Sequence, residues 1–357
     1  MYKLVLGAFM SLLFVLTPAS AARSDGHAKA GKAKKTHVGK HVAKQRGHVV
    51  RRTVVINGKR KTIYQRVIVG SSMAEAAPRQ SMGDRAGLNH TRDPLDLASS
   101  VALVLDQNNA EVLFEKNANV ALPIASITKL MTGLIVVEAG QDMMQILTVT
   151  DDDVDHEKFS SSRLRVGSQM TRASLLHIAL MSSENRAAAA LARNYPGGVA
   201  GFVAAMNAKA QELGMSDTHY VDSSGLSSRN VASARDLAKL AMVAYHEPLL
   251  RQFSTDPKSV VDAGGRLMNY HNTNYLVASP DWEIGLQKTG FINEAGRCLV
   301  MQAIIQGRAV IMVFLDSKGK LSRTADAGRV KRWLEALRPP GLGAAPVLER
   351  PGVAQGG

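Results

Sequence analysis

A serine and a lysine three positions apart are the first residues in this chain that could carry out chemistry together. In residues 126–129 (Ser-Ile-Thr-Lys) the hydroxyl and the amine fall one helical turn apart, on the same helix face. A serine hydroxyl becomes a strong nucleophile when a base removes its proton, and Lys129 can be that base if burial and a second cation lower its pKa. Because residues 317–320 (Ser-Lys-Gly-Lys) show the same spacing in a Gly-Lys turn, the pattern alone is weakly specific.

A serine and an asparagine form a second pair, in Ser183-Glu184-Asn185, between the apolar run LLHIALM and an alanine-rich run. The serine can relay a proton between a lysine, a nucleophile and a leaving amine. The asparagine amide can hold a substrate carbonyl and the lysine. The alternative interpretation is a helix N-cap, and residues 228–230 (Ser-Arg-Asn) have the same spacing.

Lys288-Thr289-Gly290 is the third group, at the end of a short predicted strand, DWEIGLQKTGF. A cation and a hydroxyl suit a substrate carboxylate, and a glycine lets another backbone approach closely. The edge of such a strand can bind a peptide by adding it to the sheet. Taken alone, the triplet is also compatible with a solvated strand end.

The three groups become specific in combination. They follow one another as Ser-x-x-Lys, Ser-x-Asn and Lys-Thr-Gly, with 57 residues from the first serine to the second and 105 from there to the lysine. Each falls on the kind of element that its role requires. The set is a known signature of penicillin-binding proteins and class A β-lactamases.

From Ser99 to about Leu337 the sequence resembles the low-molecular-mass penicillin-binding proteins, which are serine D-alanyl-D-alanine peptidases, and is most similar to their D-alanyl-D-alanine endopeptidase branch. The resemblance implies a β-lactamase/transpeptidase-like α/β (α+β) fold, with an antiparallel sheet flanked by helices. The segments that carry it are PIASITKLMTG, LMSSENRAAAALA, YPGG, FVAAMNAKA, VDSSGLSSRNVASARDLAKL, HNTNYLV, LQKTGF and AGRCLVM.

The resemblance also implies roles for the reacting groups. Ser126 attacks the carbonyl of a D-Ala and forms an acyl-enzyme, with Lys129 as the base. Ser183 passes the proton to the leaving amine, and water then hydrolyses the ester. The backbone N–H groups of Ser126 and Phe291 form the oxyanion hole, whose donors point at developing charge. Penicillins should acylate Ser126 because they resemble acyl-D-Ala-D-Ala.

Substrate binding falls to the remaining motif residues. Asn185 orients the substrate and Lys129, while Lys288 lowers the pKa of Lys129. With Thr289 and Gly290, Lys288 also binds the carboxylate next to the scissile bond. No cofactor and no metal are expected, since the histidines lack ligand spacing (His156, His177, His219 and His271).

The elements that must position these groups are also readable. VALVLD and EVLFEK predict two strands joined by a turn, and a run that is apolar nearly all round after Ser126 predicts a buried helix. Further helices are expected at 173–194 and 199–213. CLVMQAII and AVIMVFLD predict two more strands, followed by a closing helix over 322–337. Strands at both ends with helices between them predict a domain whose sheet joins its first and last strands.

Composition restricts the class of protein. The 357 residues include 44 Lys+Arg against 30 Asp+Glu, for a net charge of +14, of which residues 23–68 carry +13. One cysteine excludes an internal disulfide framework and a zinc site built from several thiolates. With 5% aromatic residues, a base-stacking nucleic-acid platform is not expected.

The sequence divides into four parts. Residues 1–21 read as a signal peptide, because Lys3 precedes a short apolar run and a small-residue cleavage pattern. We therefore expect an exported, periplasmic protein with no membrane anchor after cleavage. Residues 22–95 are a basic arm and linker with a hairpin at 51–69, residues 96–338 are the catalytic domain with order beginning near Ser99, and residues 339–357 are a disordered tail.

The arm and the activity each leave alternatives open. The arm can attract an anionic cell-wall polymer or serve as a solubilising tether, and nucleic acid is not an expected partner. A D-alanyl-D-alanine carboxypeptidase shares the motifs, but the absence of an amphipathic C-terminal anchor favours the endopeptidase. A class A β-lactamase needs a Glu-x-x-Leu-Asn motif that the sequence lacks. A non-catalytic cell-wall binding protein is the alternative from another class. Glu184 occupies a position where many relatives have a small residue, and two interpretations are open: it contacts the site, or it favours a helix start electrostatically.

Overall fold

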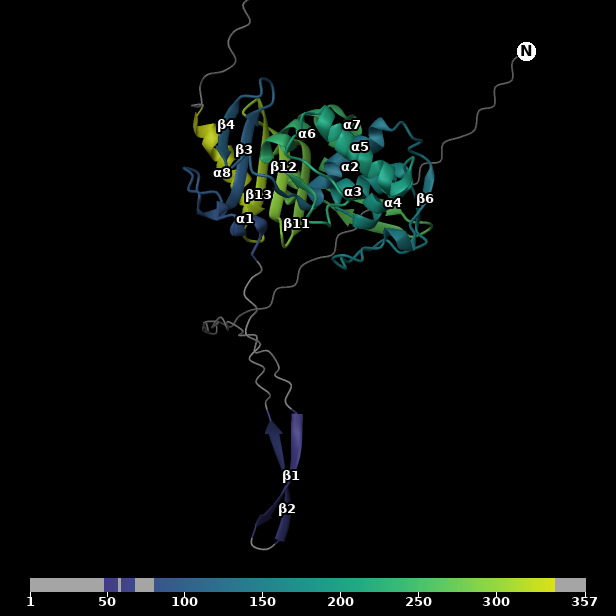
Figure 1. The fold of residues 1–357 in the computed structure, drawn as a ribbon, viewed down its shortest axis with the longest axis vertical. Helices are drawn as coiled ribbons and strands as arrows, with labels where there is room; N and C mark the ends of the chain where they lie inside the picture. Colours follow the sequence, from purple (N-terminus) through teal and green to yellow (C-terminus); the bar gives the residue numbers. More distant parts are fainter. Residues whose placement is uncertain (1–47, 57–58, 68–79, 338–357) are drawn as a thin grey trace, which may run out of the picture. The chain divides into compact units, whose positions relative to one another are not determined.

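The computed structural model describes residues 48–56, 59–67 and 80–337, which fall in two units. In the first unit, β1 (His48–Ile56) and β2 (Lys59–Val67) pair antiparallel, with Ile56 opposite Lys59 (Figure 1). The hairpin predicted at 51–69 therefore has two paired strands, and its Asn57-Gly58 turn lies outside the described residues. The expected signal peptide and disordered tail also lie outside them.

The second unit is built on a five-stranded antiparallel sheet (Figure 1). Its strands, in spatial order, are β11 (Glu283–Ile292), β12 (Gly296–Ile305), β13 (Arg308–Ser317), β3 (Ser99–Asp106) and β4 (Val112–Lys116). The first and last strands of the domain are neighbours in this sheet, which confirms the predicted fold class. Because β11 forms an edge of this sheet, one side of the Lys-Thr-Gly strand is open to the helical part of the domain.

Helices cover both faces of the sheet, so its central strands are buried on both sides. Side chains that alternate along β3 enter two separate apolar clusters, with Leu103 on one face and Val104 on the other. The closing helix, α8 (Ser322–Leu337), packs on the second face. The other helices are α1 (Met82–Arg85), α2 (Thr128–Glu138), α3 (Arg172–Met181), α4 (Asn185–Arg193), α5 (Gly198–Glu212), α6 (Ala234–His246) and α7 (Pro248–Thr255).

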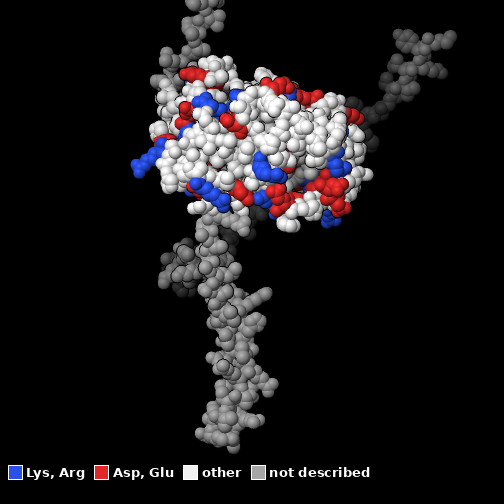
Figure 2. Space-filling model, in the orientation of Figure 1, with Lys and Arg blue, Asp and Glu red and all other residues white. Residues whose placement is uncertain are grey.

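Short elements complete the helical part. They are the strand pairs β5 (Leu122–Pro123) with β8 (Val231–Ala232), β6 (Ile146–Thr148) with β7 (Gln169–Thr171), and β9 (Lys258–Asp262) with β10 (Leu267–His271), and the 3-10 turns η1 (Leu88–His90), η2 (Ala125–Ile127), η3 (Asp151–Asp153) and η4 (Tyr275–Ala278). Within residues 48–56, 59–67 and 80–337, no helix is long and apolar enough to cross a membrane. Acidic and basic side chains are interspersed over the face of the domain that Figure 2 shows.

The helix predicted at 173–194 is wrong as a continuous element, because α3 and α4 are separate helices. Ser183 lies between them with φ of +61°, a left-handed conformation that a non-glycine residue rarely adopts. Hydrogen bonds from a distant segment hold the break open: Thr273 N–H donates to the Met181 carbonyl, and Ser182 Oγ donates to the His271 carbonyl. The sequence carries neither glycine nor proline here, so the break has no local signal.

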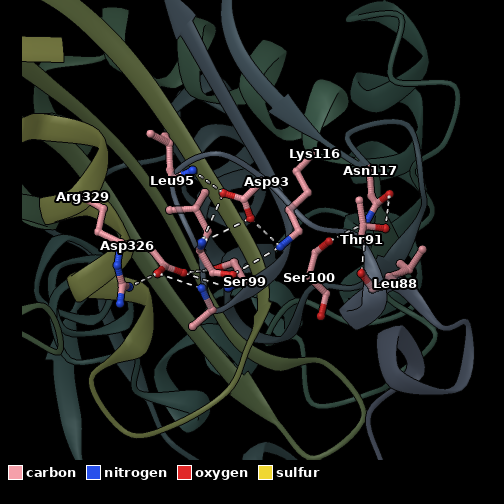
Figure 3. A network of polar contacts seen from close by, with 12 residues as sticks. Leu88, Thr91, Asp93, Leu95, Ser99, Ser100, Lys116, Asn117, Asp326 and Arg329 are labelled. Atoms are coloured by element: carbon pink, nitrogen blue, oxygen red, sulfur yellow. Dashed lines mark hydrogen bonds and ion pairs between the residues drawn. The ribbon is translucent and has the colours of Figure 1, made fainter. Parts of the chain in front are cut away.

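Order begins earlier than the predicted Ser99, because residues 80–95 of the expected linker belong to the folded domain. Ser81 caps α1, and the Met82 N–H donates to the Glu294 carbonyl at 2.8 Å. Figure 3 shows the next anchor, in which Asp93 pairs with Lys116 at 2.9 Å and accepts the Leu95 N–H group. This segment is held in place by polar contacts. Its sequence therefore has low hydrophobicity, which is why a linker was predicted there.

A buried carboxylate joins α8 to the sheet. Asp326 accepts hydrogen bonds from the Ala98 and Ser99 N–H groups and from Ser99 Oγ, at 2.6–3.0 Å, and pairs with Arg329 (Figure 3). Asp326 is fully buried, so these donors replace the hydration that it lost. The first strand and the last helix of the domain are thereby tied together.

Candidate active site

Ser126 lies in η2, two residues before the start of α2, on a tightly constrained backbone. Ala125 next to it has φ of +48°, and the Thr128 hydroxyl donates to the Ala125 carbonyl at 2.8 Å. Two glycines enclose this turn. A Cβ on Gly225 would lie 1.9 Å from the Ala125 carbonyl oxygen, and a Cβ on Gly290 would lie 2.8 Å from the Ile124 carbonyl oxygen and 3.2 Å from Ser126 N. Gly290 therefore allows the edge strand to approach the nucleophile, as its residue type predicts.

Lys129 points from the first turn of α2 to Ser126. Its Nζ lies 2.9 Å from Ser126 Oγ, 2.8 Å from Asn185 Oδ1 and 2.6 Å from the Ser224 carbonyl oxygen. The side chain is fully buried, and this burial lowers its pKa to about 7, against the opposing effect of the Asp222 and Glu184 carboxylates. An amine with this pKa is partly neutral at physiological pH and can take a proton from a serine hydroxyl.

Lys288 is a second fully buried amine, on β11. Its Nζ donates to Ser183 Oγ and to the Thr289 carbonyl, each at 2.9 Å. Burial lowers the pKa of Lys288 well below its usual range, and the charges of Lys129 and Arg323 lower it further. Burial is the main cause of the lowered pKa of Lys129, and repulsion between the two amines contributes to the lowered pKa of Lys288. The expectation that Lys288 lowers the pKa of Lys129 stays a prediction.

Asn185 begins α4 and is held at both ends of its amide. Its Oδ1 accepts from Lys129, and its Nδ2 donates to Ser160 Oγ at 2.9 Å. Ser160 is a site residue that the sequence did not reveal, since it stands in a polar loop without a recognisable motif. The break between α3 and α4 thus brings Ser183 next to Lys288, and Asn185 next to Lys129.

Thr289 and Glu184 contact the site indirectly. Thr289 Oγ1 lies 2.6 Å from Thr273 Oγ1, and Thr289 is buried. Glu184 is also buried, accepts from Ser162 Oγ at 2.6 Å, and acts on Lys129 through its charge. Of the two interpretations of Glu184, contact with the site or support of a helix start, its hydrogen bond and its effect on Lys129 support the first.

A loop that is closed by its own hydrogen bonds holds the Ser224 carbonyl against Lys129. Asp222 accepts from the N–H groups of Ser224, Gly225 and Ser227 at 2.6–3.0 Å, and Asn230 Nδ2 donates to the Asp222 carbonyl and to Thr128 Oγ1. No role was predicted for these residues, although an aspartate two positions before Ser-Gly is typical of such a turn.

A cavity of about 250 Å³ opens over the nucleophile. It is lined by Ser126, Lys158, Ser160, Asn185, Gly225, Leu226 and residues 291–294 (Phe-Ile-Asn-Glu). Phe291, whose backbone is the expected second oxyanion donor, thus shares the cavity with Ser126. A larger cavity of about 680 Å³ adjoins at Phe291 and Asn293, but none of the groups bonded to Lys129 lines it. The smaller cavity is therefore the one that can hold a reacting bond.

Fold and geometry together define a class of protein: a serine acyl-transfer enzyme with a lysine base, built between a helical region and a sheet edge. The model of the D-alanyl-D-alanine carboxypeptidase family matches residues 88–319, and the chain belongs to this family of serine D-alanyl-D-alanine peptidases.

Curated relatives and solved structures agree with this family. The chain is 45% identical over 278 residues to a D-alanyl-D-alanine endopeptidase of Pseudomonas aeruginosa, covering 77% of this chain and 86% of the relative. It is 42% identical to one of Escherichia coli, covering 67% and 78%. The structure of the Streptomyces K15 DD-transpeptidase is similar with a TM-score of 0.63, 27% identity and coverage of 69% and 100%. Penicillin-binding protein D2 of Listeria monocytogenes, solved in its cefotaxime-bound form, has a TM-score of 0.61, 28% identity and coverage of 68% and 98%.

Proposed function

We propose that this protein is an exported D-alanyl-D-alanine endopeptidase that cleaves peptide crosslinks of peptidoglycan through an acyl-enzyme on Ser126. The observation that carries the chemistry is the contact of Lys129 Nζ with Ser126 Oγ at 2.9 Å, inside a buried environment that lowers the lysine pKa to about 7. The names of the relatives that are 45% and 42% identical support the endopeptidase over the carboxypeptidase.

Acylation begins with neutral Lys129, which removes the Ser126 proton as the oxygen attacks the carbonyl of D-Ala. The negative charge that develops on the carbonyl oxygen is stabilised by the backbone N–H groups of Ser126 and Phe291. The proton then reaches the leaving amine through Ser183, which Lys288 holds at 2.9 Å. Water attacks the ester with Lys129 again as the base, which releases the donor peptide and restores the hydroxyl.

Binding and orientation come from the groups around the nucleophile. Asn185, fixed by Lys129 and Ser160, presents its amide toward the acyl portion of the substrate. Lys288, Thr289 and Gly290 on the edge strand receive the carboxylate of the leaving residue. A β-lactam enters the same site and leaves a slowly hydrolysed ester on Ser126.

A competition experiment tests the proposal. The protein, from residue 22 on, is incubated with crosslinked muropeptide dimers and pentapeptide monomers together, and products are separated by chromatography and mass. The endopeptidase converts dimers to monomers in preference to releasing D-Ala from pentapeptides, and Ser126→Ala does neither. Preferential D-Ala release identifies a carboxypeptidase, and no reaction with either substrate supports a non-catalytic binding role.

The basic arm is a separate proposal with its own test. We infer that residues 22–68 bind an anionic cell-wall polymer, because 13 of the 14 net positive charges lie in residues 23–68. Deleting 22–68 should abolish salt-sensitive retention on anionic wall material and leave cleavage of soluble muropeptides intact. Equal retention of both proteins supports the tether, and a loss of activity on small substrates contradicts both interpretations of the arm.

A further inference from the structure

The cavity of about 680 Å³ that adjoins the site at Phe291 has no role in acylation or deacylation. It lies between three segments: α1, the hairpin of β11 and β12, and the end of β13 with the loop that leads to α8. Its charged lining residues are Asp84, Arg297, Asp316 and Lys318. Its volume is that of a ligand site, for which about 300–1,000 Å³ is usual.

The edge strand β11 separates this cavity from the nucleophile. Gly290 faces the helical side of the sheet, where it packs against the turn of Ser126. Thr289 and Phe291 point to the opposite face, because side chains alternate along a strand. Leu299, the partner of Thr289 on β12, belongs to the apolar cluster that α8 covers. The carboxylate site at Thr289 and the cavity at Phe291 therefore lie on the same face of the sheet.

Arg297 is the cation of this cavity that no carboxylate neutralises. It lies opposite Phe291 on β12, and its guanidinium carbon is 4.6 Å from the centre of the Phe291 ring. Within residues 80–337, no acidic side chain forms an ion pair with it. A guanidinium that is stacked on a ring still presents its N–H groups to a carboxylate, in a planar fork that suits two oxygens.

The other charged residues of the cavity leave its accessible charge positive. Asp84 pairs with Lys318 at 2.5 Å. Asp316 is fully buried, and this burial raises its pKa and keeps its carboxylate away from solvent. An anionic ligand in the cavity therefore meets Arg297 without a competing exposed carboxylate.

Basic side chains continue from this cavity to the catalytic groups. Arg323, in the first turn of α8, donates to the carbonyl of Gly290 at 2.7 Å and to that of Cys298 at 3.3 Å. Burial lowers the pKa of Lys288 and of Arg323. The charge of Arg323 adds to this effect on Lys288, and the charge of Arg297 adds to it on Arg323. The three cations thus follow one another from the leaving residue's carboxylate to the cavity.

We propose that this cavity binds the leaving strand of the crosslink, with Arg297 paired to a carboxylate of that strand beyond the residue at the scissile bond. The inference rests on the proposed function, which places the carboxylate of the leaving residue at Lys288 and Thr289. The leaving strand of a crosslinked dimer is itself a peptide, so it extends past that residue and brings a carboxyl group of its own. A pentapeptide releases a single D-Ala, which ends at Thr289. The cavity therefore favours crosslinked peptides over terminal D-Ala.

Two synthetic crosslinks test this assignment. Both join the same donor D-Ala to the same leaving residue, which keeps its carboxylate and is extended to a short peptide whose carboxyl terminus is either free or amidated. We expect kcat/KM of the wild type to be about tenfold higher for the free acid, the value of one charge-assisted contact. Arg297→Gln should bring this ratio to about one, and Arg297→Lys, which keeps the charge, should retain part of it.

A matched control separates recognition from a general loss of activity. Arg235→Gln removes a partly exposed arginine that pairs with Glu115 on β4, the opposite edge of the sheet, and should keep the full preference. If Arg297 only supports the Phe291 ring, Arg297→Gln lowers cleavage of both crosslinks by the same factor, which overturns the proposal.

Two outcomes for the wild type complete the test. Equal cleavage of the acid and the amide overturns the role of Arg297 and leaves the endopeptidase activity in place. Cleavage of neither crosslink overturns the proposed function and this inference with it.

Discussion

The pKa of Lys129 predicts how acylation of Ser126 depends on pH. The base must be neutral, so the rate falls as pH falls through the pKa of about 7. About one tenth of the molecules hold a neutral amine at pH 6 and about nine tenths at pH 8. We expect the second-order rate constant for acylation by a fluorescent penicillin to rise about tenfold between these pH values. Reactions quenched at successive times and analysed by in-gel fluorescence or intact-mass spectrometry give this rate constant directly.

A charge-removing variant identifies the titrating group as Lys129. The Glu184 carboxylate raises the pKa of Lys129 and is not among the groups that act on Lys288. Glu184→Gln should therefore move the rising limb of the profile to lower pH. Its rate constant at pH 6, taken as a fraction of its own value at pH 8, should then exceed the same fraction for the wild type. Glu212→Gln, on the exposed end of α5, is the control and should leave the limb in place. A rate that is flat between pH 6 and 8, or a limb that Glu184→Gln moves to higher pH, would refute this reasoning.

Three further predictions follow from single contacts. Lys129→Arg should acylate at background rates although charge is kept, since arginine cannot lose its proton; substantial turnover in this variant contradicts a base at this position. Gly225→Ala puts a Cβ 1.9 Å from the Ala125 carbonyl oxygen and should lower acylation about a hundredfold by displacing the nucleophile, so an unchanged rate contradicts the constraint. Asp93→Ala leaves Lys116 buried without its partner and should cost about 3–5 kcal/mol in urea unfolding, and a loss below about 1 kcal/mol contradicts a buried pair.

The fold was predictable where the sequence carries periodic apolar signals. The strands of the central sheet, the buried helix after Ser126 and the closing helix all read directly from such runs. The break between α3 and α4 was not predictable, because tertiary hydrogen bonds from residues 271–273 impose it. Residues 80–95 were missed for a related reason, since buried polar contacts such as Asp93 with Lys116 leave no hydrophobic pattern.

The site was predictable to the extent that its residues belong to motifs. The three motif groups lie together, with Lys129 bonded to Ser126 and Asn185, and Lys288 bonded to Ser183. Residues that act through a single backbone carbonyl or loop, such as Ser160 and Ser224, have no motif of their own. Burial, one of the two predicted causes of a low pKa at Lys129, is present in the structure, as the apolar run after Ser126 indicated.

Capture of the acyl-enzyme formed from a crosslinked peptide shows directly whether Ser126 is the nucleophile. The protein is mixed with purified muropeptide dimer, quenched in acid within the first turnover, digested and mapped by mass spectrometry. We expect the donor stem peptide as an ester on Ser126, with no adduct in Ser126→Ala. An ester on another residue, or dimer cleavage in the Ser126→Ala variant, would contradict it.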